Sequence, residues 1–141
     1  MAKTCYRELQ NYKYQLMDDY LHQTDIKPEQ DINYKFMSLD ANGVLMARKA
    51  YAWDGPSGIA IDTPNFMRGS LVHDVLYQMM RLGALDANEH RKRADEILRE
   101  ICLEDGMSSF RAWYVYQGVR LFGKAHAAQN NDPEVKIICA P

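Results

Sequence analysis

His73 is the histidine whose neighbours in the sequence best suit proton transfer. Tyr77 follows four residues later, so on a helix the two side chains share a face. Asp95 lies on the apolar side of the next predicted helix, and a short connection makes the two helices antiparallel neighbours. Because an unpaired buried carboxylate is costly, we expect Asp95 to accept a hydrogen bond from His73. Such a carboxylate would fix the tautomer of a catalytic base and stabilise its imidazolium form.

A second group of residues suits a hard cation. Asp74 follows His73 and is rotated about 100° from it around the helix axis. The preceding loop, residues 53–58 (WDGPSG), offers backbone carbonyls, and Asp54 and Asp62 offer further carboxylates. Oxygen ligands of this kind bind Ca²⁺. The pattern predicts a hydrolytic site in which His73 activates water and a calcium ion polarises a carbonyl or phosphoryl oxygen.

Each of these residues also has a structural interpretation. His73 can be a histidine bonded within the core, and Asp74 in a first helical turn favours the helix dipole. Tyr77 can pack with a bonded hydroxyl, and residues 54–57 can form only a tight turn. Asp95 can be satisfied by a salt bridge, for which the candidate partners are Arg68, Arg81 and Arg111.

Length and composition indicate a single globular domain over residues 1–141, with residues 1–11 and 125–141 as candidate flexible ends. The net charge of -2, with one short basic run at residues 91–93, argues against nucleic-acid binding as a function. The first ten residues lack a signal-peptide pattern, and no apolar run approaches the roughly 18 residues of a membrane span. The three scattered cysteines fit reduced thiols. These features predict a cytoplasmic protein.

The first half of the chain predicts antiparallel strands. Aromatic residues alternate with polar ones over residues 12–16 and 20–24, which predicts two strands joined at residues 18–19. The alternative is one helix over residues 6–22. The Asp-Ala-Asn-Gly sequence at residues 40–43 predicts the turn of a hairpin whose second strand, residues 44–51, leads into the loop.

The second half predicts three helices, which makes the fold α+β. Thr63 and Pro64 suggest a short helical turn, and Ser70 suggests the N-cap of a new helix that ends at Gly83. A second helix is predicted from Leu85 to about residue 104. Ser108 or Ser109 caps the third helix, which ends at Gly123. Residues 1–10 are expected to form an arm or a frayed turn, and residues 135–139 a short strand or a frayed end.

Four segments together resemble the DUF1353 family of phage and bacterial proteins. They are GVLMARKAYAWDGPSG, FMRGSLVHDVLYQMMR, RKRADEIL and RAWYVYQGVRLFG, and the resemblance covers residues 34–123. It implies a phage or prophage origin, hence a protein of the host cytoplasm or of a virion, and no particular reaction.

A shorter set of motifs is similar to the bacterial and fungal phospholipases A2. The DGPS sequence at residues 54–57 resembles their calcium loop, and HDVLY at residues 73–77 resembles their catalytic helix. The resemblance implies that His73 is the base, that Asp95 orients it, and that Tyr77 belongs to the same site. It also implies a calcium ion, with the ligands Asp74, Asp54, Trp53, Gly55 and Ser57. The flanking cysteines of those enzymes are absent here, where Val72 precedes the histidine.

Two functions follow from these patterns. One is a small calcium-assisted hydrolase that acts on an ester, with a lipid as a candidate substrate. The alternative is a non-enzymatic phage or virion module that docks on a phage or host protein, in which the loop and the His–Asp network are structural.

Overall fold

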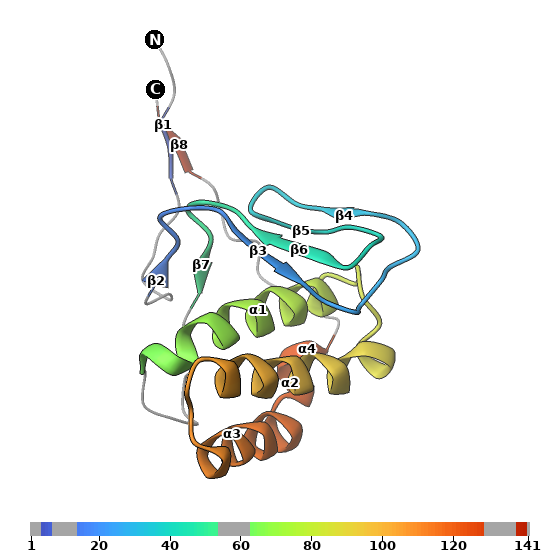
Figure 1. Cartoon of the computed structure of the whole chain (residues 1–141). Coiled ribbons are helices and arrows are strands. Elements are labelled where there is room, and N and C mark those ends of the chain that lie inside the picture. Colours follow the sequence, from blue (N-terminus) through green and yellow to red (C-terminus); the bar gives the residue numbers. More distant parts are fainter. Residues whose placement is uncertain (1–3, 7–13, 54–62, 129–137, 141) are drawn as a thin grey trace.

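Antiparallel strands precede a helical half, as the α+β prediction requires (Figure 1). The computed structural model describes residues 4–6, 14–53, 63–128 and 138–140. Its elements are β1 Thr4–Tyr6, β2 Tyr14–Gln15, β3 Tyr20–Gln23, β4 Ile32–Asn33, β5 Met37–Leu39, β6 Val44–Ala47, β7 Ala52–Trp53, α1 Pro64–Arg81, α2 Ala87–Glu104, α3 Ser109–Phe122, α4 Lys124–Ala127 and β8 Ile138–Ala140.

The largest sheet has four antiparallel strands in the order β3-β6-β5-β4. Its central hairpin, β5 and β6, turns at residues 40–43 as predicted. Asp40 Oδ1 accepts hydrogen bonds from the backbone N–H groups of Asn42 and Val44, both at 2.9 Å, and Gly43 has a φ of +87°. The second strand ends at Ala47 rather than at residue 51, because the chain turns next: Ala50 has a φ of +78°.

The strands near the N-terminus differ from the prediction in their pairing. β2 and β3 flank residues 18–19 but do not pair with each other: β2 pairs with β7, and β3 pairs with β6. Asp19 Oδ1 accepts a 2.6 Å bond from the backbone N–H of Lys49, which fixes the connection against the β6–β7 turn. A single helix reaching residue 22, the alternative, is wrong, because residues 14–15 and 20–22 lie in strands. The arm expected at residues 1–10 contains β1, which pairs antiparallel with β8.

Helix α1 is longer than the sequence suggested. It begins at Pro64, with Thr63 as N-cap, and continues through Ser70, which was expected to start a new helix. The residue before Ser70, Gly69, lies where α1 approaches α2: a Cβ there would be 3.0 Å from Leu98 Cδ1 and 3.1 Å from Cys102 Sγ. The Gly-Ser pair therefore permits close helix packing and is not a break.

The other helix ends follow their capping residues. Asp86 accepts a bond from Asn88 N–H at the start of α2, and Ser108 accepts one from Arg111 N–H at the start of α3. Gly83, with a φ of +80°, follows α1 as predicted. The four-residue helix α4, after Gly123, was not predicted.

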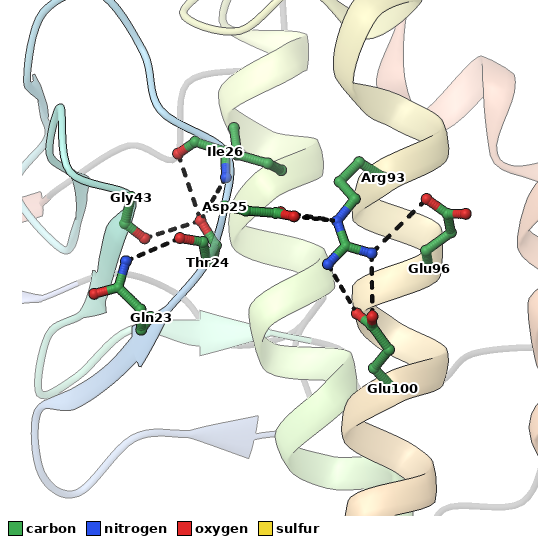
Figure 2. Close-up of polar contacts among 8 residues, drawn as sticks. All are labelled: Gln23, Thr24, Asp25, Ile26, Gly43, Arg93, Glu96 and Glu100. Atoms are coloured by element: carbon green, nitrogen blue, oxygen red, sulfur yellow. Dashed lines mark hydrogen bonds and ion pairs between the residues drawn. The ribbon is translucent and has the colours of Figure 1, made fainter.

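The helices lie on one side of the four-stranded sheet, with α1 next to the strands and α3 farthest from them (Figure 1). One apolar core fills the space between the sheet, α1 and α2, and a second lies between α1, α2 and α3. At the surface, Arg93 of α2 donates a 2.8 Å bond to Asp25, which follows β3, and also pairs with Glu96 and Glu100 (Figure 2). These contacts tie the strand layer to α2.

Candidate functional site

The centre of the candidate site is the carboxylate of Asp95, which is fully buried on α2. Its Oδ1 atom lies 2.7 Å from Nε2 of His73 and accepts a 2.5 Å bond from the hydroxyl of Tyr77. Both partners come from α1, where a spacing of four residues places them on one face. Their rings lie 4.1 Å apart between centroids, with an angle of 35° between the ring planes. The expected hydrogen bond between His73 and Asp95 is therefore present.

The other carboxylate oxygen of Asp95 faces two guanidinium groups. Arg120 of α3 donates a 2.9 Å bond to Oδ2, and Arg91, four residues before Asp95 on α2, lies 3.6 Å from the same atom. The partners predicted from the sequence were Arg68, Arg81 and Arg111. Of these, Arg68 instead binds Asp105, because α1 starts beside the end of α2. The four-residue spacing between Arg91 and Asp95 could have predicted their contact from the sequence. Arg120 could not be predicted in this way, because it is 25 residues from Asp95 and lies on another helix.

These contacts set the charge state of Asp95. Burial by itself raises the pKa of the Asp95 carboxyl, but the hydrogen bonds and charges of His73, Tyr77 and Arg120 outweigh burial and hold the pKa below its usual value. Burial, together with the adjacent carboxylate, raises the pKa of the Tyr77 phenol well above its usual value. Asp95 is thus an anion with a neutral phenol as donor, and this arrangement suits a group that orients an imidazole.

His73 is oriented for one chemical role. When its Nε2–H donates to Asp95, the neutral ring carries its lone pair on Nδ1. Within the described part of the chain, Nδ1 has no hydrogen-bond partner. The residue as a whole is 7% exposed. The tautomer that Asp95 favours therefore leaves Nδ1 as the basic atom.

The end of α3 closes over this network. Arg91 donates to the backbone carbonyls of Val119 and Arg120, at 3.2 and 3.3 Å. A Cβ at Gly123 would lie 2.6 Å from the hydroxyl of Tyr77 and 2.4 Å from the carbonyl oxygen of Val119. Glycine is therefore required at this position, because any side chain would displace the hydroxyl that binds Asp95.

The predicted calcium ligands are only partly within the described residues. Asp54, Gly55 and Ser57 lie outside them. Asp74 is half-buried on α1, and Trp53 is buried, with its indole N–H donating a 3.1 Å bond to Ser70 Oγ. Residues 4–6, 14–53, 63–128 and 138–140 hold no group of three or more His, Cys, Asp or Glu side chains arranged for a metal. The calcium site stays a prediction.

Fold and site together define a small α+β protein built around a buried His–Asp–Tyr network. The family described as "Protein of unknown function (DUF1353)" matches residues 33–119, more than half of the chain, and the chain belongs to this family. The matched region contains His73, Tyr77, Arg91 and Asp95 and ends one residue before Arg120. No curated protein and no solved structure matches. No helix in the described parts of the chain has the length and apolar character needed to cross a membrane.

Proposed function

We propose that this protein hydrolyses an acyl ester, with His73 as the general base. The observation that carries the proposal is the 2.7 Å contact between Nε2 of His73 and the buried carboxylate of Asp95. It fixes the tautomer in which Nδ1 is basic, and it provides a countercharge for the imidazolium that proton transfer produces.

The proposed reaction uses Nδ1 of His73 twice. Nδ1 accepts a proton from a water molecule while the water oxygen bonds to the ester carbonyl carbon. The tetrahedral intermediate then collapses, the bond to the alkoxide breaks, and the imidazolium returns the proton from Nδ1 to that leaving group. Asp95 keeps the ring oriented through both transfers, and Tyr77 holds Asp95 in place.

A calcium ion is the proposed electrophile, held by Asp74 and by oxygen atoms of Trp53, Asp54, Gly55 and Ser57. The carboxylates and carbonyls in this set are the ligands that Ca²⁺ prefers. The bond from Trp53 to Ser70 supports the proposal, because it places the start of the loop one helical turn before His73. A bound ion would polarise the ester carbonyl.

Replacing the base tests the proposal directly. His73→Asn is expected to lower hydrolysis of a fluorogenic ester or phospholipid by about 10²–10⁴-fold, the usual contribution of a general base. The matched control is His126→Asn, at an exposed position, which should keep parental activity. A folded parent protein that is inactive towards ester substrates with Ca²⁺ present would contradict the proposal.

Calcium binding has a separate test. Millimolar Ca²⁺ should raise the Tm of the parent protein and EDTA should lower it, because an ion that binds only the folded state stabilises it. Asp74→Asn should remove the shift, while Asp86→Asn, at the N-cap of α2, should keep it. An unchanged Tm for the parent would remove calcium from the proposal and leave the role of His73 intact.

The second candidate function is a phage or virion module that docks on a phage or host protein. The two guanidinium groups on Asp95 favour this alternative, because they balance the carboxylate as a structural ion network does. In that case His73→Asn should lower stability without removing a measured activity. Capture of a partner from host lysate should survive His73→Asn but fail after changes to surface Tyr or Trp residues.

A further inference from the structure

Helix α3 is apolar on two opposite faces. Ala112, Val115 and Val119 are buried against the rest of the helical half. The opposite face presents an outer stripe, defined as the exposed residues Phe110, Trp113, Tyr114 and Leu121. Their spacing of i, i+3, i+4 and i+11 places them in one row. Phe110 and Leu121 are 75% and 73% exposed, so the stripe reaches both ends of the helix.

The charged side chains within α3 and α4 are basic. Residues 107–128 carry three basic residues, Arg111, Arg120 and Lys124, and no Asp or Glu, although the whole chain has a net charge of -2. Arg111 and Arg120 lie on opposite flanks of the stripe, each about 80–100° from its centre. Arg120 also binds Asp95, which Arg91 faces as well, so these three groups together keep a net positive charge. The preceding carboxylates, Glu104 and Asp105, are both bonded to Arg68. This single guanidinium balances one of the two carboxylate charges.

We infer that the outer stripe of α3 docks this protein on an anionic lipid surface. A row of Trp, Tyr, Phe and Leu with flanking cations is the composition of helices that lie in the membrane interface. Trp113 and Tyr114 suit this place, because their rings are apolar while their N–H and O–H groups remain hydrated. Helix α3 also lies at the end of the helical half away from the four-stranded sheet (Figure 1).

The docking surface stands independently of the hydrolase proposal. The stripe and the His73 network share only α3, whose Arg120 binds Asp95 from the flank of the stripe. His73→Asn should therefore leave membrane binding unchanged even where it removes activity. This difference allows the two proposals to fail separately.

Vesicle binding provides the test. The full chain is mixed with vesicles of phosphatidylcholine containing phosphatidylglycerol, and with vesicles of phosphatidylcholine alone, and bound protein is measured by co-sedimentation. Binding should be stronger with the anionic lipid and should weaken with added salt, since screening reduces attraction between surface charges. The double variant Phe110→Ser, Leu121→Ser should bind at least about tenfold more weakly, because both apolar contacts are lost. Both positions are exposed, so its Tm should match that of the parent.

Fluorescence locates the contact. The chain has two tryptophans, and Trp53 is buried while Trp113 belongs to the stripe. Anionic vesicles should shift the emission of the parent to shorter wavelength, and Trp113→Phe should abolish the shift while retaining binding. Absence of binding by the parent to anionic vesicles would overturn the inference. So would self-association or capture of a host protein that the double variant abolishes while vesicle binding is unaffected.

Discussion

Two ion networks are centred on Asp95 and Arg93, two residues apart on α2, and they differ in burial and in the sign of the central charge. Asp95 points inward and is a fully buried anion that receives donors from α1, α2 and α3. Arg93 points outward and is a cation that binds Asp25, Glu96 and Glu100 (Figure 2). In the outward network every partner side chain is more than 40% exposed.

The difference between these networks is one of solvation. Water and salt already stabilise separated charges at the surface, so the Arg93 contacts contribute little and guide the packing of the strand layer on α2. Around the buried carboxylate of Asp95, water cannot replace a lost hydrogen-bond donor, so the remaining charged groups would stay incompletely paired. The inward network therefore holds three helices in a single arrangement, and the same arrangement orients His73.

The largest effect is expected from Asp95→Asn. The change removes the charge that balances Arg120 and Arg91, and it should lower the free energy of unfolding by about 3–5 kcal/mol, the usual cost of breaking a buried pair. Urea denaturation of the parent and the variant measures this difference in the free energy of unfolding. The matched control is Asp25→Asn in the outward network, expected to cost about 1 kcal/mol or less. Equal costs for the two variants would contradict the comparison.

A smaller loss is expected from Tyr77→Phe. Removal of the hydroxyl takes one donor from the buried carboxylate and should cost about 1.5–3 kcal/mol, the range for a hydrogen bond to a charged group. Tyr114→Phe, at an exposed position on α3, should change stability by no more than about 0.5 kcal/mol. A Tyr77 variant as stable as the parent would mean that the phenol does not support Asp95.

The pH dependence of unfolding should separate the two carboxylates. The folded-state pKa values of Asp95 and Asp25 both lie below 3.8, so their stabilising contributions are present above that pH and disappear as the pH falls through the folded-state values. Asp95→Asn should flatten the acid side of the stability profile more than Asp25→Asn, because Asp25 is exposed and screened. In 1 M NaCl only the contribution of Asp25 should shrink markedly. The opposite ranking would contradict the assignment.

The smallest effect is expected from Arg93→Gln. Three carboxylates lose their partner, but all remain hydrated, so the cost should be about 1 kcal/mol or less and should decrease further at high salt. Thermal unfolding at two salt concentrations provides the measurement. A loss comparable with that of Asp95→Asn would show that the outward network also carries the fold.

Much of this fold could be predicted from local signals. Asp40 and Gly43 fix a tight turn through their own backbone preferences, and Asp86 and Ser108 cap helices through bonds that span only two or three residues. The pairing of His73 with Asp95 was also accessible, because two consecutive helices with a short connection pack side by side.

Only the tertiary structure decided which charges surround Asp95 and which strands pair with β2 and β3. Arg120 reaches Asp95 because α3 folds back over α2. Strand β2 pairs with β7, which lies more than thirty residues later in the sequence. The role of the Gly69-Ser70 pair likewise depended on residues distant in the sequence, because Leu98 and Cys102 leave no room for a side chain at position 69. Local sequence determined the turns, caps and apolar faces because their energies arise within a few residues. The burial of one carboxylate beneath three helices is a property of the assembled core.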